Sequence, residues 1–209
     1  VHFAVDDDDI KMCTWLCGKG SWFLPFNKGL NGGAGNPVNP NGVRTAYLWE
    51  EILAKESLSD IIENYAQVVK KKDEKTGTEK TSVVWPRYHQ LDGVRRLLAA
   101  TRQKGVGQRF LIQHSAGSGK SNSITWLAYQ LVGLLDGTQA LLDSVIVVTD
   151  RINLDTQIKN NIVAFKRLQT LVAWADSADS LRKHFERGKK IIITIVHKFP
   201  FILDAIGTE

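Results

Sequence analysis

Apolar residues recur with two different periods along the chain. In the first part, short apolar and aromatic runs at His2–Val5, Ile10–Cys17 and Ser21–Leu24 are separated by turn residues, among them the acidic run Asp6–Asp9. Short runs between turn residues predict strands arranged as a hairpin. The segment Asn27–Gly42 is rich in Asn, Gly and Pro, a composition that predicts a loop.

A helical period follows this loop. The apolar spacing predicts one helix that begins at Thr45 or shortly after, and a second helix over Ser57–Val69. Residues 70–82 are polar and charged, which predicts a surface linker. The linker divides a small mixed α+β segment, residues 1–69, from a second region, residues 83–209.

Strands and helices alternate in the second region. The predicted helices are Tyr88–Thr101, Asn122–Leu135, Leu154–Phe165 and Ser180–Arg187. The predicted strands are Phe110–Gln113, Val145–Thr149, Leu171–Trp174 and Ile191–Val196. This alternation predicts an α/β fold with a parallel sheet. The β-branched run Val145–Thr149 is typical of a strand covered on both faces.

Composition places the chain among globular proteins. Of its 209 residues, 43% are hydrophobic and 23% are charged, which excludes a disordered tail and a collagen-like fibre. No apolar run approaches the ~20 residues that a membrane span needs, so we expect no membrane partner. The two cysteines favour a reducing, cytoplasmic location over a disulfide-bridged secreted fold.

Charge is distributed unevenly. Residues 70–120 hold 12 Lys and Arg against four Asp and Glu, whereas residues 1–69 hold five against nine. A concentrated basic excess can attract a polyanion such as nucleic acid. Solvated surface lysines are the simpler alternative, and charge alone does not choose between the two.

The segment His114–Ser121 reads His-Ser-Ala-Gly-Ser-Gly-Lys-Ser between a predicted strand and a predicted helix. This is the context of a phosphate-binding loop, where glycines let backbone N–H groups face phosphates at a helix N-terminus. Lys120 can neutralise the β and γ phosphates, and Ser121 can offer a hydroxyl to the Mg²⁺ of ATP, so both are predicted catalytic residues. The strict pattern begins with Gly where this chain has His114, and a bare glycine turn is the alternative. The predicted ATP-binding residues of this segment are Ala116, Gly117, Ser118, Gly119, Lys120, Ser121 and Asn122.

A second candidate lies about 30 residues before Lys120, at Arg87-Tyr88-His89-Gln90. An aromatic ring that stacks on adenine, with an amide that pairs with its edge, would select ATP over other nucleotides. We therefore interpret Arg87, Tyr88 and Gln90 as further ATP-binding residues. The alternative is a polar helix start.

Taken together, these blocks resemble the motor subunit of type I restriction enzymes, a branch of the superfamily-two helicases. Pro86–Gln90 resembles the adenine-reading Q-motif of those helicases, and His114–Ser121 resembles their motif I. The other blocks that carry the likeness are Phe23–Gly29, Gly32–Pro37, Tyr47–Glu50, Val147–Gln157 and Ile192–Phe199.

The resemblance implies an ATP- and Mg²⁺-dependent translocase of double-stranded DNA in the prokaryotic cytoplasm, working with modification and specificity subunits. It implies that residues 83–209 begin the first RecA-like motor lobe and that residues 1–69 end a nuclease-side region. The Asp-Glu-Ala-His box, the second lobe and the nuclease carboxylates are expected outside this chain, so the fragment alone is expected to be inactive.

DNA contacts of a translocase should be to phosphates, because movement cannot depend on sequence. Arg151, Asn153 and Lys198 are the candidate DNA-binding residues, with ordinary surface charges or helix caps as the alternative. Another superfamily-two helicase, another P-loop ATPase, or a non-catalytic nucleotide-binding module are the competing functions.

Overall fold

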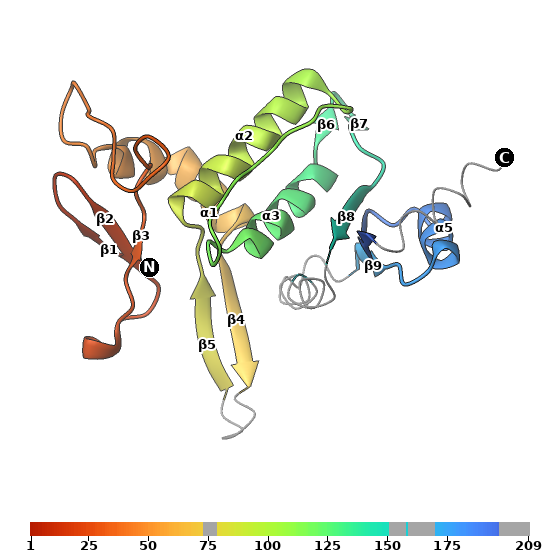
Figure 1. The fold of residues 1–209 in the computed structure, drawn as a ribbon, viewed down its shortest axis with the longest axis horizontal. Helices are drawn as coiled ribbons and strands as arrows, with labels where there is room; N and C mark the ends of the chain where they lie inside the picture. Colours follow the sequence, from red (N-terminus) through yellow and green to blue (C-terminus); the bar gives the residue numbers. More distant parts are fainter. Residues whose placement is uncertain (73–78, 151–157, 159–169, 197–209) are drawn as a thin grey trace. The chain divides into compact units, whose positions relative to one another are not determined.

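The chain forms two compact units, Val1–Asp92 and Gly93–Glu209, in a computed structural model (Figure 1). The structure describes residues 1–72, 79–150, 158 and 170–196. The elements of the first unit are β1 (His2–Val5), β2 (Ile10–Cys13), the 3-10 turn η1 (Gly18–Gly20), β3 (Leu24–Pro25), the π-helical turn η2 (Leu48–Ile52), α1 (Lys55–Asn64), β4 (Gln67–Lys72) and β5 (Glu79–Val84). Helix α2 (Tyr88–Lys104) runs across the division. The elements of the second unit are α3 (Lys120–Val132), β6 (Leu135–Asp136), β7 (Gln139–Ala140), β8 (Val145–Thr149), β9 (Val172–Trp174), α5 (Ala178–Glu186) and β10 (Ile191–Ile195).

The first unit opens with the antiparallel sheet β1-β2-β3, which confirms the predicted hairpin. Strand β2 is shorter than predicted and β3 begins later, because the chain turns away after Cys13 through η1. The acidic run forms the turn between β1 and β2. There the Asp6 carboxylate accepts hydrogen bonds from the N–H groups of Asp8 and Asp9, at 2.8 and 2.7 Å. The bond from Asp9 is the larger cause that holds the pKa of Asp6 below its usual value.

The segment 27–42 is a loop, as predicted, and a buried amide organises it. The Asn36 side chain is 2% exposed. Its Oδ1 accepts a hydrogen bond from the Lys28 N–H at 2.8 Å, while its Nδ2 donates to the Asp8 carbonyl at 2.8 Å and to Asn27 Oδ1 at 3.0 Å. These bonds tie the loop to the β1–β2 turn.

One prediction for the end of the first unit is wrong. The helix expected over 57–69 ends at Asn64, and Val69 lies in strand β4. The segment expected as a surface linker, 70–82, lies for the most part in the antiparallel ribbon β4–β5. Val68 and Val69 favour a pleated ladder with β5, and this pairing overrides the helical spacing that continues through the run. The division into segments 1–69, 70–82 and 83–209 stays a prediction.

The second unit has the parallel three-stranded sheet that the alternating pattern predicts, in the order β8-β10-β9. Central strand β10 is buried along Ile191–Thr194. Ile191 and Ile193 pack in a cluster with Ala128 of α3, whereas Ile192 packs with Leu181 of α5. The opposite faces of β10 are therefore covered by different helices, an arrangement consistent with a RecA-like lobe.

Two predictions for the second unit need correction. Phe110–Gln113 is not a strand: Leu111 is 91% exposed, and no described strand lies alongside to complete a ladder. Strand β8 is covered on one face, since Ile146 and Val148 are exposed at the sheet edge. The ribbon β6–β7 was not predicted. The helix predicted over 154–165 lies outside the described residues, except for buried Ile158.

Candidate nucleotide site

The phosphate loop owes its shape to two glycines. Gly117 and Gly119 have φ angles of 71° and 80°, in the left-handed region that disfavours other residues. A Cβ atom built on Gly117 would meet no atom within 4 Å, so the conformation and not crowding demands glycine there. Gly119 is also the N-cap of α3 and makes no side-chain cap bond, so backbone N–H groups open the helix.

Lys120 is held over this loop. Its exposed ammonium donates hydrogen bonds to the carbonyls of His114 and Ser115, at 3.1 and 2.8 Å. The ammonium therefore lies at the N-terminal end of α3. There the loop N–H groups and the positive end of the helix dipole favour the binding of an anion. No acidic residue lies in the first turn of α3 itself.

Helix α3 is anchored firmly beneath the loop. Trp126 and Thr125 are fully buried, and the Thr125 hydroxyl donates to the Ser121 carbonyl at 2.9 Å. His114, which stands where the strict motif has Gly, reaches α2: a Cβ built on Gly93 would lie 3.9 Å from its Cε1 and 3.7 Å from Ile112 Cδ1. A histidine at this position is therefore accommodated beside a small residue of α2.

The segment 87–90 begins α2 and serves the fold of the first unit. The Gln90 side chain is 3% exposed, and its Oε1 accepts a hydrogen bond from the Arg87 N–H at 2.8 Å. The Tyr88 ring meets Tyr47 and Phe26 edge-on, with ring centroids 5.3 and 6.0 Å apart. The contacts of Gln90 and Tyr88 in this structure are thus those expected of a helix start. That these residues bind adenine stays a prediction.

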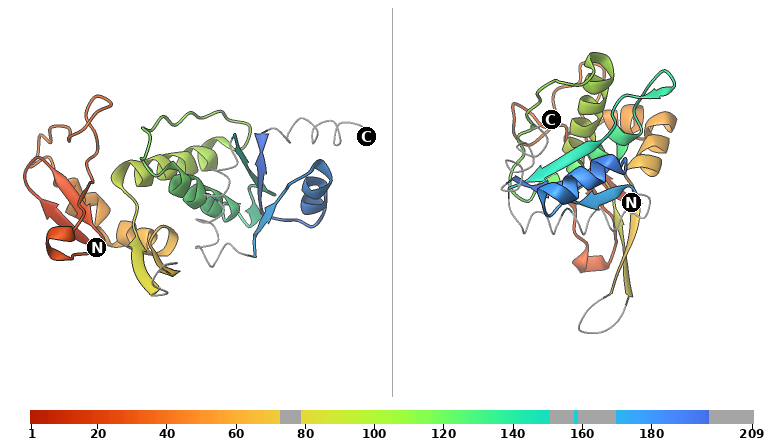
Figure 2. Two further views of the ribbon diagram at one scale, coloured as in Figure 1. Left: turned by 60° about the horizontal axis from the view of Figure 1, so that its bottom comes forward. Right: turned by 90° about the vertical axis from the view of Figure 1, so that its right-hand side faces the viewer.

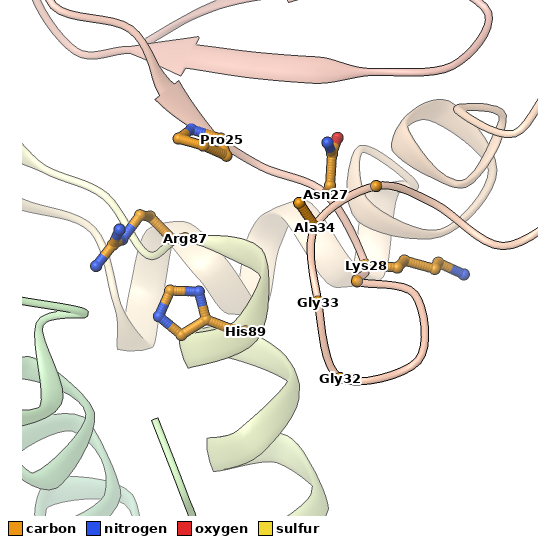
Figure 3. A pocket seen from close by; sticks show the side chains of 10 residues that line it. Pro25, Asn27, Lys28, Gly32, Gly33, Ala34, Arg87 and His89 are labelled. Carbon is orange, nitrogen blue, oxygen red and sulfur yellow. The ribbon is translucent and has the colours of Figure 1, made fainter. Parts of the chain in front are cut away.

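Arg87 and His89 line a cavity of about 390 Å³ in the first unit (Figure 3). Its other wall is the glycine-rich loop, from Gly29 to Gly35, with Pro25, Asn27 and Lys28. None of these lining residues is acidic. Partial burial lowers the pKa of the Arg87 guanidinium, which stays cationic at neutral pH. The cavity lining thus mixes polar and apolar surface and includes the Arg87 cation, and the cavity is large enough for a small anionic ligand or a nucleotide base.

The charge of Lys28, one of the lining residues, is compensated by Glu51, which does not line the cavity. Its Nζ lies 2.8 and 2.9 Å from the two carboxylate oxygens of Glu51 and 4.7 Å from the centre of the Tyr47 ring. The Tyr47 hydroxyl donates to the Phe26 carbonyl at 2.9 Å, and burial raises the pKa of this phenol. These contacts fix the root of the glycine-rich loop.

The predicted site residues form two groups, one at 116–122 and one at 87–90. The structure places the first group together in one continuous loop. Ala116 to Asn122 form a continuous loop and helix start. Within the second group, Arg87 reaches the cavity, whereas sequence reasoning missed His89 and the glycine-rich loop as lining residues. The many glycines around Asn27–Gly35 predicted a loop in this segment. They did not predict that the loop lines a cavity. Arg151, Asn153 and Lys198 lie outside the described residues.

A family model for the SWI2/SNF2 ATPases matches residues 89–206, more than half of the chain. This chain belongs to the SWI2/SNF2 ATPase family. The matched span contains most of α2, the phosphate loop and the parallel sheet. No curated protein matches the chain. Membership makes ATP the nucleotide and a helicase-like ATPase the general activity, and it places the protein within superfamily two.

Further features of the described part of this SWI2/SNF2 ATPase chain concern membrane-spanning helices, metal-ligand clusters and disulfides. Of the helices described, none is both long and apolar enough to cross a membrane. Within the described ranges, no three His, Cys, Asp or Glu side chains gather as a metal site. Cys13 and Cys17 are free thiols, the first buried and the second exposed. Ser121, at the start of α3, stays the predicted protein ligand of the Mg²⁺ that accompanies ATP.

Proposed function

We propose that this chain is the ATP-binding part of the DNA-translocating subunit of a type I restriction-modification system. The observation that carries the proposal is the cradle formed by Gly117, Gly119 and Lys120 at the start of α3, inside a SWI2/SNF2 ATPase match. The likeness of the upstream blocks Phe23–Gly29 and Gly32–Pro37 to that subunit supports the finer assignment. Double-stranded DNA and the modification and specificity subunits are the proposed partners, in a prokaryotic cytoplasm.

The residues of the cradle bind and orient the triphosphate. On binding, the Lys120 ammonium exchanges its two carbonyl contacts for phosphate oxygens, and the backbone N–H groups of the loop hold the same group from below. The Ser121 hydroxyl is at the helix start, where it can reach the metal that accompanies ATP. The metal, when bound, neutralises charge that develops on the phosphates during transfer. Arg87 is proposed to contact the base, as its place in the Q-motif-like block Pro86–Gln90 implies.

The binding step is tested on the 209-residue chain itself. Lys120→Ala removes the cation while leaving the buried anchors of α3 in place, so we expect Mg·ATP affinity to fall at least tenfold in calorimetric titration. Lys104→Ala, an exposed lysine in the last turn of α2, serves as the control and should bind like wild type. We expect neither form of the chain to hydrolyse ATP. Equal affinity of wild type and Lys120→Ala would contradict the proposed site.

A further inference from the structure

Strand β8 carries a buried hydroxyl at its carboxyl end. The Thr149 side chain is 3% exposed, and its Oγ1 has no hydrogen-bond partner among the described residues. A buried hydroxyl without a partner costs free energy, because water hydrogen-bonds the same group in the unfolded chain. Thr149 ends the run Val145–Thr149, in which a further valine would pack without this cost. The orphaned hydroxyl therefore calls for a partner that the packing of the strand does not supply.

Thr149 lies on the face of β8 that α3 covers. Alternate residues of a strand share a face, and Val147, two residues earlier, packs in one cluster with Ala128 of α3. Val148, which lies between them in sequence, faces the other way and is 44% exposed. Figure 2 shows α3 and α5 on opposite sides of the sheet, in agreement with the packing of Ile192 against α5. The Thr149 hydroxyl therefore belongs to the α3 side.

The carboxyl end of β8 lies level with the first part of α3. Helix α3 leads to the ribbon β6–β7, and β8 returns from it, so helix and strand run in opposite directions (Figure 1). The step from Val147 to Thr149 advances about 7 Å, which corresponds to about four to five residues of helix. Counted back from Ala128, this distance places Thr149 beside the turn that contains Ile124, which packs against the same cluster. Lys120 lies about one helical turn further along.

This end of the sheet is also where a phosphate-bearing ligand is expected. Parallel α/β sheets bind their ligands at the carboxyl ends of the strands. In a phosphate loop the backbone N–H groups cradle the α and β phosphates, whereas the lysine reaches the β and γ phosphates. A hydroxyl beyond the lysine, at the strand ends, is therefore suited to the γ end of the triphosphate.

We propose that Thr149 Oγ1 donates a hydrogen bond to the γ-phosphate end of Mg·ATP, to a phosphate oxygen or to a water molecule of the metal shell. The inference rests on the proposed function, which supplies the ATP. A charged acceptor makes this bond stronger than a bond between neutral groups. The hydroxyl that costs stability in the free chain is thus satisfied when the nucleotide is bound.

The test compares the Mg·ATP and Mg·ADP affinities of the 209-residue chain by calorimetric titration. Thr149→Val removes the hydroxyl and keeps a β-branched side chain, so Mg·ATP affinity should fall about tenfold while Mg·ADP affinity stays unchanged. The same substitution removes an orphaned buried group, so the melting temperature without nucleotide should rise by about 2–4 °C. Thr149→Ser keeps a hydroxyl and should bind Mg·ATP nearly like wild type. A role in packing alone would not weaken ATP binding while raising stability.

The matched control is Thr194→Val, on the neighbouring strand β10. Thr194 is 1% exposed, but its hydroxyl donates to the Ala175 carbonyl at 3.1 Å. Thr194→Val should therefore lower the melting temperature and keep the wild-type Mg·ATP affinity.

Three results would overturn the role of Thr149 alone: wild-type Mg·ATP affinity in Thr149→Val, a loss that Thr149→Ser shares, or equal losses of Mg·ATP and Mg·ADP affinity. In each of these cases the proposed nucleotide site stands if Lys120→Ala loses Mg·ATP affinity in the same assay. Failure of the wild-type chain to bind Mg·ATP would instead overturn the proposed site, and this inference with it.

Discussion

Asn36 illustrates how a single side chain can hold a wall of the cavity in place. Its three hydrogen bonds join the glycine-rich loop to Asp8 and to Asn27. Asn36→Ala leaves the Lys28 N–H and the Asp8 carbonyl without these partners, so we expect the free energy of unfolding to fall by about 2–3 kcal/mol. Urea denaturation measures the change. Asn41→Ala, at an exposed position of the same loop, should change stability by less than about 0.5 kcal/mol. Equal effects of the two substitutions would contradict the organising role of Asn36.

Gly117 gives a second prediction at this scale, because its φ of 71° is strained for any residue with a Cβ. Gly117→Ala should cost roughly 1–2 kcal/mol of stability or force the loop into another shape. In either case Mg·ATP affinity should fall about tenfold or more, which calorimetric titration detects. Gly133→Ala, at the other end of α3 with a φ of −89°, is the control and should keep normal affinity. Normal ATP affinity in Gly117→Ala would show that the left-handed loop is dispensable.

Residue types predicted the left-handed glycines of the phosphate loop, whereas they did not predict the protein contacts of the segment 87–90. Gly117, Gly119 and Lys120 form a local motif whose conformation follows from neighbours in sequence. Gln90 and Tyr88 were interpreted through a possible ligand, yet in the structure they contact Arg87 and Tyr47. The contact of Tyr88 with Tyr47 joins distant segments of the chain, which a spacing pattern cannot reveal, whereas Gln90 contacts Arg87 within the same helix start.

At the scale of elements, two glycines at α2 should respond in opposite ways to replacement by alanine. Gly93 lies inside the helix, and an added Cβ would meet only ordinary contacts, at 3.7 and 3.9 Å. Gly93→Ala should therefore stabilise the protein by about 0.5–1 kcal/mol, since alanine is the better helix former. Gly105, directly after the helix, has a φ of 73°, so Gly105→Ala should destabilise by about 1 kcal/mol or more. Urea denaturation of both variants tests this, and the same sign for both would contradict the assigned helix end.

The helices and strands show where periodicity succeeds. The predicted strands Val145–Thr149 and His2–Val5 match β8 and β1, because each pairs along its whole length with a described neighbour. Phe110–Gln113 is equally apolar but has no described strand beside it. Residues 67–69 continue a helical spacing, yet cross-strand pairing with β5 decides their conformation. In both failures the missing information is whether a neighbouring strand completes a ladder.

At the scale of the whole molecule, the basic excess of residues 70–120 separates into distinct parts. Lys120 belongs to the phosphate loop and Arg87 lines the cavity, while the lysines of β4 and β5 form the ribbon. The sequence alone indicated attraction for a polyanion without choosing one. The SWI2/SNF2 ATPase match makes ATP one such polyanion, and the proposed function assigns Lys120 to its phosphates.

The most direct test is DNA-stimulated ATP hydrolysis by the complete subunit, comparing wild type with Lys120→Ala. A translocase couples hydrolysis to movement, so duplex DNA should raise the wild-type rate, while Lys120→Ala should abolish hydrolysis with and without DNA. Lys104→Ala should behave like wild type. Retention of DNA-dependent hydrolysis in Lys120→Ala, or a wild-type rate indifferent to DNA, would contradict the assignment of this chain to a DNA-translocating ATPase.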